Sequence, residues 1–571
     1  MKINKKCLII VFSFFVIILL RIALTYNYRI HVINSGEDDA LMVNWALSMQ
    51  DGKWLGEYKY NTLMKGPIFS FILVTLHRLN IKYFLFVNIF YVASCTMFIF
   101  SIRRIIKNKY LLISFFIILV FNPVMFSREV TQRVYRNALI PSFAVFLVSG
   151  YIGAFLNSKD NLLSYFLYIG ILSVGLPLFY YLREDSIWLV PFIIFMTIST
   201  LVMLLLNMKK TSKSILIVKC LLLFVPIIAI GLLGQKIERK NEIFYGLRTQ
   251  NVLSDSNFTD AIKAIYSVKP NKVVDRVTVT QEKALRMTTV SLSFSEIYPK
   301  LTELMVGYNA FDSNPNDFEC EDGWFLWALR LAVGLSGYNN IQQEQDIYKR
   351  IADELNDAMD NGLIEKQNVM PSALLSPYRK GYAGKTMKKI FECFSYVVSC
   401  KDIYIQNKVE VTTDEETYKN EVYKVEVLTN EKASLEPGKE NGEYEELINK
   451  TKIISIIISI YKFLGIVFLI YGTIMYVVLI AMSVINVKNK NYEIIKSFIV
   501  TSGALGLLFT LIVGISYNDV ATADSIKVLY LCGAYPLLFV FCILSSYFGT
   551  TALKNYKFYR KNKVDGKHAI S

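Results

Sequence analysis

Long blocks of apolar residues dominate this chain and limit what it can fold into. It has 571 residues, of which 53% are hydrophobic and 19% charged, with a mean hydropathy of +0.38. Blocks of about 18 or more apolar residues match the hydrocarbon thickness of a bilayer. Because a helix satisfies its own backbone hydrogen bonds, we expect each block to cross the membrane as a helix. The sequence predicts an all-α polytopic membrane protein.

Ten blocks predict transmembrane helices. They cover residues 7–25, 83–102, 110–126, 138–156, 162–182, 187–207, 215–234, 455–484, 497–516 and 526–549. The stretch 66–79 is shorter and carries His77 and Arg78 near its end. Its length suits an interfacial or re-entrant helix better than a span.

The basic residues indicate how the spans are oriented. The net charge is +15, and many of the lysines and arginines lie in short segments between apolar blocks, which is typical of cytoplasmic loops and not of a nucleic-acid-binding protein. If 66–79 does not cross, the clusters at 103–109, 209–213 and 488–496 and the tail 554–567 all fall inside; if it crosses, the first two move outside. We therefore expect both termini to be cytoplasmic. The Lys-, Asn- and Ile-rich composition favours a bacterial plasma membrane.

This topology divides the chain into four parts. Residues 1–235 form a transmembrane module with a first outer loop at 26–82, and residues 236–450 form an α-rich extracytoplasmic domain and linker after the seventh span. Residues 451–553 return to the membrane, and 554–571 form a basic cytoplasmic tail. Helices are expected at 324–335 and at 343–361, where one apolar stripe contains Ile347, Ile351, Leu355, Ala358 and Met359. Residues 403–450 favour a weak strand pair or a solvated linker.

An acidic cluster at 36–39 follows the first span. Asp38 and Asp39 fit a helix start, because acids in a first turn favour the helix dipole. They also fit a catalytic general base, which would take a proton from an acceptor hydroxyl. Adjacent helical residues point about 100° apart, so only one of the two is expected to reach a given substrate atom.

Two more charged clusters fall on the outer face. Arg128, Arg133 and Arg136 either bind a lipid phosphate through charge-assisted forks or lie at the interface, with Glu129 pairing to Arg133 at i,i+4.

Arg183, Glu184 and Asp185 provide possible support on the outer face or form a salt-bridged loop. Lys65 offers a second phosphate contact just before Pro67, a residue favoured in a first helical turn. Trp324 follows Asp322 and Gly323 in the outer domain. It fits a core residue better than a carbohydrate platform.

The first outer loop resembles that of the GT-C membrane glycosyltransferases, the class that contains protein O-mannosyltransferases and aminoarabinose transferases. The resemblance lies in residues 37–40, 52–56 and 63–67, where an acidic pair is followed by a Lys/Pro-containing helix along the membrane. It covers about residues 1–235, and the seven spans fit the shared amino-terminal module. Residues 183–191 and the outer domain also resemble uncharacterised bacterial members with this loop.

The resemblance implies a function. Asp38 matches the family's catalytic carboxylate, Asp39 stands where Glu is more usual, and Lys65 matches the lysine before the proline. The implied activity is transfer of a sugar from a polyprenyl-phosphate donor, which enters from the membrane lipid, to an acceptor on the outer face. The resemblance also allows a divalent metal between carboxylate and phosphate, because some relatives use one.

Two other functions fit the same pattern. A transporter would carry charges deep within its spans and inverted repeats, but the main charge within a predicted span is Lys219 and no repeat is evident. A scaffold or sensor would bind a partner through the outer domain, and the acidic cluster would then be dispensable.

Overall fold

The computed structural model describes residues 5–26, 28–32, 38–159, 162–206, 208, 212–309, 319–368, 376–405, 415–433, 442–488 and 492–568. Within these ranges the chain forms helices and three isolated β-bridges, without a strand. Its long apolar helices make it a polytopic α-helical membrane protein, as the composition predicts.

Eight of the described helices are long and apolar enough to cross a membrane. They are α4 (Tyr83–Ile102), α6 (Ile140–Asn157), α7 (Leu162–Tyr180), α8 (Val190–Leu206), α9 (Lys213–Tyr245), α17 (Gly442–Lys488), α18 (Tyr492–Ala521) and α20 (Ala534–His568). The other two predicted spans correspond to α1 (Lys5–Thr25), whose described apolar part is Phe12–Thr25, and to the shorter helix α5 (Lys109–Val120).

The expected helix over 110–126 is wrong at its C-terminal end. Helix α5 has 12 residues, or about 18 Å, which is less than the ~30 Å hydrocarbon core. It is followed by a 3₁₀ turn, Pro123–Phe126, whose first residue has no N–H to continue an α-helix. The next residues, up to the start of α6, are buried at nearly every position.

A helix that ends inside the protein leaves carbonyl groups that need partners. Side chains from three other helices supply them. Arg21 of α1, which is fully buried, donates to the carbonyls of Val120 and Met125 at 3.1 Å each. The hydroxyl groups of Tyr91 and Tyr461 donate to Leu119 and Ile118. Arg21 is therefore a structural charge inside a predicted span.

Helix α3 (Ile68–Arg78) is the short apolar stretch around His77. Its 11 residues extend about 16 Å, too short for a span. It packs against α2 (Asp38–Gln50) and α16 (Glu415–Thr429). The ring Nδ1 of His77 lies 3.0 Å from the carbonyl oxygen of Val427 in α16.

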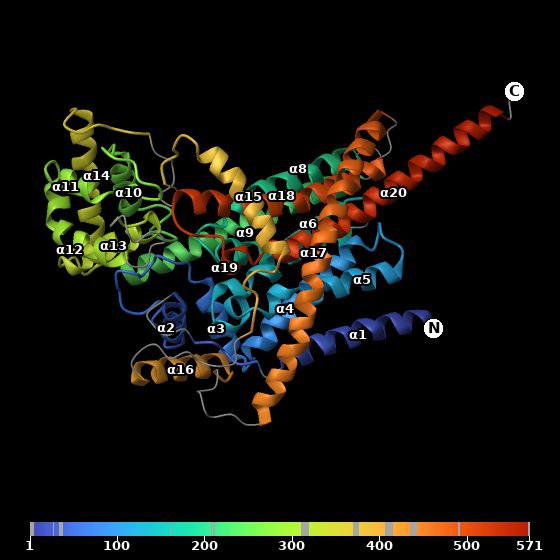
Figure 1. Cartoon of the computed structure of the whole chain (residues 1–571), viewed down its shortest axis with the longest axis horizontal. Helices are drawn as coiled ribbons and strands as arrows, with labels where there is room; N and C mark the ends of the chain where they lie inside the picture. Colours follow the sequence, from blue (N-terminus) through green and yellow to red (C-terminus); the bar gives the residue numbers. More distant parts are fainter. Residues whose placement is uncertain are drawn as a thin grey trace.

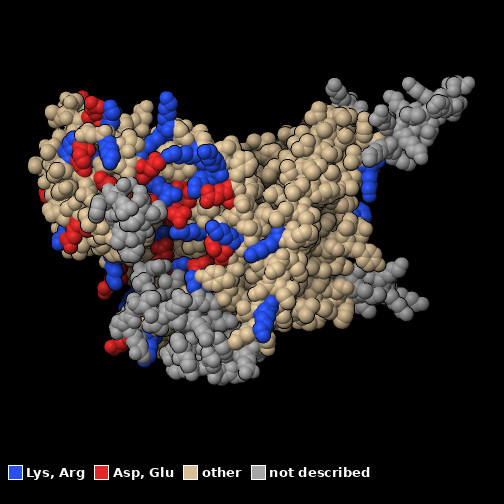
Figure 2. All heavy atoms as spheres, in the orientation of Figure 1, with Lys and Arg blue, Asp and Glu red and all other residues tan. Residues whose placement is uncertain are grey.

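The two ends of the molecule differ in character. Figure 1 shows the start of α1 and the end of α20 at one end, and helices α10 (Asn257–Ser267) to α14 (Ile341–Asp360) at the other. Figure 2 shows charged side chains crowded over α10–α14 and the adjoining end of the bundle, whereas the visible bundle surface is mostly uncharged. Both described chain ends thus lie on the side opposite the polar domain.

The polar domain is a helical unit with its own hydrophobic core. It contains α10, α11 (Gln281–Thr288), α12 (Leu292–Asn309), α13 (Asp322–Leu335) and α14. The two predicted helices are confirmed, and the apolar stripe of α14 is buried. Helix α9 runs through residues 235 and 236 without a break and ends at Tyr245, so the expected boundary falls inside a helix.

The predicted strand pair within 403–450 is wrong for the described part of that segment. Glu415–Thr429 is helix α16, which buries Tyr418, Val425 and Leu428. Their spacings of seven and three residues place them on one helical face. The alternation of Val and Tyr in the sequence hides this face. After the polar domain, α15 (Tyr382–Val398) packs on α18 and leads back to the bundle.

Candidate functional site

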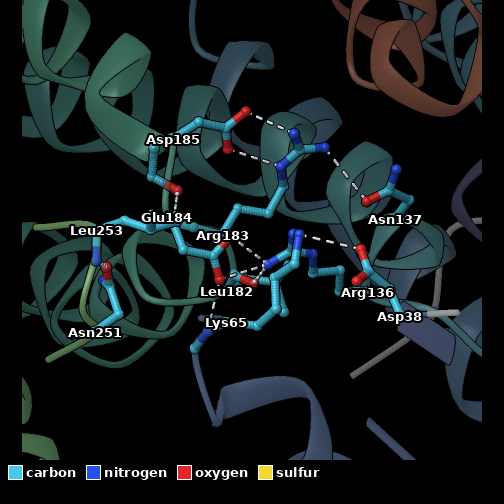
Figure 3. A network of polar contacts seen from close by, with 12 residues as sticks. Asp38, Lys65, Arg136, Asn137, Leu182, Arg183, Glu184, Asp185, Asn251 and Leu253 are labelled. Atoms are coloured by element: carbon cyan, nitrogen blue, oxygen red, sulfur yellow. Dashed lines mark hydrogen bonds and ion pairs between the residues drawn. The ribbon is translucent and has the colours of Figure 1, made fainter. Parts of the chain in front are cut away.

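The predicted outer charges come together next to the polar domain, where Lys65 lies beside Trp327 of α13. Figure 3 shows Asp38, Lys65, Arg136, Arg183, Glu184 and Asp185 among them. They come from the first turn of α2, the loop before α3, the buried segment between α5 and α6, and the loop between α7 and α8. The ten residues are Asp38, Asp39, Lys65, Arg128, Glu129, Arg133, Arg136, Arg183, Glu184 and Asp185. Residues 36 and 37 of the acidic cluster lie outside the described residues. Hydrogen bonds and ion pairs link these segments.

Asp38 faces two groups from distant segments. Its Oδ2 lies 3.1 Å from the Nζ of Lys65 and accepts a hydrogen bond from the Tyr135 hydroxyl at 3.0 Å. Burial alone would raise the pKa of Asp38, but Lys65, the charge of Arg136 and the Tyr135 hydrogen bond hold it below its ordinary value. The side chain is 31% exposed. Asp38 is therefore an ionised carboxylate that remains partly accessible.

Asp39 has a different environment. The guanidinium of Arg133 donates two hydrogen bonds to its carboxylate, from Nε to Oδ2 at 2.9 Å and from Nη2 to Oδ1 at 2.6 Å. The same guanidinium donates to Glu129 at 3.2 Å. Burial raises the pKa of Asp39 above its ordinary value even though Arg133 opposes that rise. This buried pair fixes α2 against the segment before α6, and only Asp38 of the two acids is partly open.

Arg128 continues this chain of pairs. It forms an ion pair with Glu129, and its guanidinium lies 5.0 Å from the ring centroid of Tyr404. Its backbone N–H donates to the carbonyl of Tyr404 at 2.7 Å. The expected i,i+4 pair of Glu129 and Arg133 is confirmed at 3.2 Å. These contacts hold both arginines in place, and the phosphate-binding role of Arg128 and Arg133 stays a prediction.

Arg136 and Glu184 form a buried pair that holds the Lys65 loop. Nη1 of Arg136 lies 2.7 Å from both oxygens of Glu184, and Nε donates to the Tyr135 hydroxyl at 3.1 Å. Glu184 also accepts the backbone N–H of Gly66 at 2.6 Å. A Cβ at Gly66 would lie 2.7 Å from a backbone oxygen, so this close approach requires glycine. The loop therefore enters α3 with Lys65 directed at Asp38.

Arg183 and Asp185 form the most open pair. Nε and Nη2 of Arg183 donate to the two oxygens of Asp185 at 2.8 and 2.6 Å, and Nη1 donates to Asn137 at 3.4 Å. The Asp185 side chain is 50% exposed. Figure 3 shows this pair beside the Arg136–Glu184 pair. The predicted salt-bridged loop is confirmed.

The first outer loop is bound to the polar domain by a fully buried arginine that the sequence analysis missed. Arg330 of α13 donates to the carbonyls of Tyr60 and Thr62 at 2.7 and 3.2 Å and to the Tyr58 hydroxyl at 3.0 Å. Its partner Glu344 lies 3.2 Å away and is also buried. In the linear sequence, Arg330 is the single charge of the apolar stretch 324–335, which gives no sign of its partners.

An aromatic side chain of the polar domain lies beside Lys65. Its Nζ lies 5.2 Å from the ring centroid of Trp327 in α13. Trp324, one turn earlier, stacks on Tyr308 and packs against the core of the polar domain. This agrees with the prediction that Trp324 is a core residue. Sequence analysis also missed Tyr135, although it lies between Arg133 and Arg136 in the chain. Its hydroxyl joins Asp38 to Arg136.

The described acids do not fit a metal centre. No group of three or more His, Cys, Asp or Glu side chains suited to a metal occurs in the described part of the chain. Asp38, Asp39 and Glu129 each face a lysine or an arginine. A divalent cation at this site would have to displace these cations.

The ten predicted residues comprise five acids and five bases, so their formal charges cancel. An anion that binds this cluster competes with its carboxylates for the same cationic donors. Comparisons of this chain with protein-family models, curated proteins and solved structures each returned no match.

Proposed function

We propose that this chain is a membrane glycosyltransferase that transfers a sugar from a polyprenyl-phosphate donor to an acceptor on the outer face. The observation that carries the proposal is the environment of Asp38. A partly accessible carboxylate lies between Lys65 and Tyr135, next to Arg136, at the end of the bundle where the polar domain lies. This geometry supports the proposal, because the reaction requires a general base next to a cationic contact for the donor phosphate.

The donor phosphate would enter by replacing carboxylates. The acids of two pairs are the most exposed: Asp38, paired with Lys65, at 31% and Asp185, paired with Arg183, at 50%, against 21% for Glu129. The Arg136–Glu184 pair is nearly closed to solvent. The two open pairs can exchange a carboxylate for a phosphate at the lowest desolvation cost, because their groups are already partly hydrated. Lys65 and Arg183 then hold the phosphate, with Arg136 as a fixed neighbouring charge.

This exchange also activates Asp38. The pKa of Asp38 is held low by Lys65 among other groups, so the carboxylate is a weak base while the pair is closed. When Lys65 turns to the phosphate, the pKa of Asp38 rises and the carboxylate becomes a stronger base. Asp38 then takes the acceptor's hydroxyl proton, and the acceptor oxygen bonds to the anomeric carbon. The bond from that carbon to the phosphate oxygen breaks, and polyprenyl phosphate leaves with the electron pair.

Asp39, Glu129 and Arg133 have a positioning role in this proposal. Arg133 joins Asp39 to Glu129, so α2 is fixed at its first turn. Because Asp38 is the neighbouring residue on that turn, its direction depends on this buried pair. In this proposal Asp39 affects the reaction only by positioning Asp38 and does not contact the substrate.

A non-catalytic scaffold or sensor is the alternative, and the charge balance of the cluster favours it. Ten residues that neutralise each other also fit a purely structural role, in which the ion pairs hold α2 and the neighbouring loops to one another. The two functions differ in what the Asp38 charge contributes. A structural role needs it for folding, whereas an enzyme needs it for turnover. A transporter has less support, because the intramembrane charge Lys219 donates to the carbonyl of Ser158 and thus has a structural contact.

The test compares cells that lack this chain with cells that carry it as wild type or as Asp38→Asn. Polyprenyl-phosphate-linked sugars are extracted and quantified by mass spectrometry. Wild type should keep one such donor at a low level, whereas the deletion and Asp38→Asn should accumulate it to the same extent at equal protein levels. Asp51→Asn, an exposed acid after α2, is the matched control and should behave as wild type. An unchanged donor pool in the deletion, or full rescue by Asp38→Asn, would contradict the proposal.

A further inference from the structure

A groove of about 650 Å³ runs along the bundle, and the end lined by Arg103 and Arg104 lies on the side opposite the candidate site. It is lined by residues of α1, α4 and α7, with Asn157 of α6 at one end. Its volume is typical of sites for small organic ligands. It shares no residue with the ten of the candidate site.

The lining changes character along the groove. Ile22 of α1, Val92 of α4 and Ile171 of α7 contribute to a long apolar wall. Arg103 and Arg104, which follow the last residue of α4, lie at the other end together with Asn157. None of the described residues that line the groove is acidic. The groove therefore has an apolar part and a cationic end, which makes it complementary to a molecule with a long apolar chain and an anionic headgroup.

The groove opens towards the membrane. Ile89 and Phe100 of α4 and Leu167 of α7 line it, and about half of each side chain is exposed. From Ile89 to Arg104 the chain rises on the order of 22 Å along the helix, more than the ~15 Å of one leaflet. An acyl chain of one leaflet can thus lie along α4 in full.

Two local contacts shape the cationic end. The guanidinium of Arg103 lies 4.6 Å from the ring centroid of Phe100, a cation–π contact that holds it beside the groove. The ring of Tyr168 lies against Gly153 of α6, where a Cβ would come within 2.1 Å of it. Glycine at this position lets the ring sit against α6 and form part of the lining.

We propose that this groove binds an anionic glycerophospholipid of the leaflet on the side of the chain termini. One acyl chain lies along α4 between α1 and α7, and the phosphate lies at Arg103 and Arg104. Guanidinium groups suit this role because they hold phosphate oxygens with paired donors. Basic pockets between helices on the cytoplasmic side are a known means of binding anionic headgroups. This site is independent of the proposed transfer reaction.

The test uses the purified full-length chain and measures retained lipid by native mass spectrometry. Dioleoyl phosphatidylglycerol and dioleoyl phosphatidylcholine are added in equal amounts. The wild-type chain should retain phosphatidylglycerol, and R103Q/R104Q should retain it about tenfold less. K107Q/K109Q removes two exposed charges from the adjoining segment and should leave retention unchanged. Equal losses in the two double variants would show a general charge attraction and overturn the proposal.

A second variant tests the apolar part. Ala93 lines the groove and is exposed, so Ala93→Trp fills the groove without disturbing the core. It should also lower phosphatidylglycerol retention, to the level of R103Q/R104Q, because the indole occupies the space of the acyl chain. Val174→Trp, on an exposed position of α7 outside the groove, should not. Equal retention of the two phospholipids by the wild type, or preferential retention of added polyprenyl phosphate, would reject the proposed ligand.

Discussion

The ammonium of Lys65 lies 3.1 Å from the carboxylate of Asp38, although α2 and a long loop separate the two residues in the chain. Two buried pairs enforce this contact from opposite sides. Arg133 fixes the turn that carries Asp38, and Glu184 holds the backbone of Gly66 next to Lys65. The ion pair is therefore imposed by the surrounding structure, and its two members can be changed separately.

Removing the positive charge at Lys65 should shift the pH dependence of sugar transfer. Lys65 lowers the pKa of Asp38, so Lys65→Gln raises that pKa. A base works only when ionised, so the acid limb of kcat/KM should move to higher pH. The measurement is the pH profile with the donor identified above. The control is Lys53→Gln, at an exposed lysine of the same loop, and it should leave the acid limb in place. An unshifted acid limb in Lys65→Gln would show that Lys65 does not control the pKa of the catalytic base.

Asp38→Asn and Asp39→Asn should fail in different ways. Asp39→Asn leaves Arg133 buried with half of its fork unpaired, which should destabilise the protein by about 3 kcal/mol. Asp38 is partly exposed, so Asp38→Asn should keep the wild-type melting temperature in detergent. Thermal unfolding followed by intrinsic fluorescence distinguishes the two variants. Equal destabilisation by both would assign Asp38 a purely structural role.

The buried Arg330–Glu344 pair should be essential for holding the first outer loop on the polar domain. Arg330→Met removes three hydrogen bonds to that loop and leaves Glu344 without its counter-charge. Loss of one partner of a buried pair typically costs about 3–5 kcal/mol.

Limited proteolysis of the full chain should then cut between α2 and α3 at a much lower protease concentration. Arg350→Met, on the exposed face of α14, is the control and should resist cleavage as wild type does.

The topology can be tested with a membrane-impermeant maleimide on intact cells. Lys53 and Lys107 are both exposed and lie at opposite ends of the bundle in the expected topology. Cysteine at Lys53 should label from outside, and cysteine at Lys107 should label only after permeabilisation. Lys65 is a poorer position because it is mostly buried in its ion pair. Labelling of both positions from the same side would overturn the predicted arrangement of the spans.

The sequence was enough to predict which charged residues form the candidate site, but not which of them form ion pairs with each other. Charges at 38–39, 128–136 and 183–185 stand out because they interrupt apolar blocks, and the structure brings all three clusters together. The local pair of Glu129 and Arg133 followed from helical spacing. The pairs of Asp38 with Lys65 and of Arg136 with Glu184 did not, because each joins loops whose relative position depends on how the helices pack.

Local sequence is enough to make this chain a membrane protein built of helices. Hydrophobic block length and backbone hydrogen bonding are properties of local sequence, and they leave few alternatives in lipid. The packing of the helices determines where α5 ends, because Arg21, Tyr91 and Tyr461 reach its last carbonyls from other helices. Packing also determines which acid of the first outer loop is buried and which stays partly open. The buried acid, Asp39, is held by two hydrogen bonds from Arg133, which lies beyond α3, α4 and α5 in the chain.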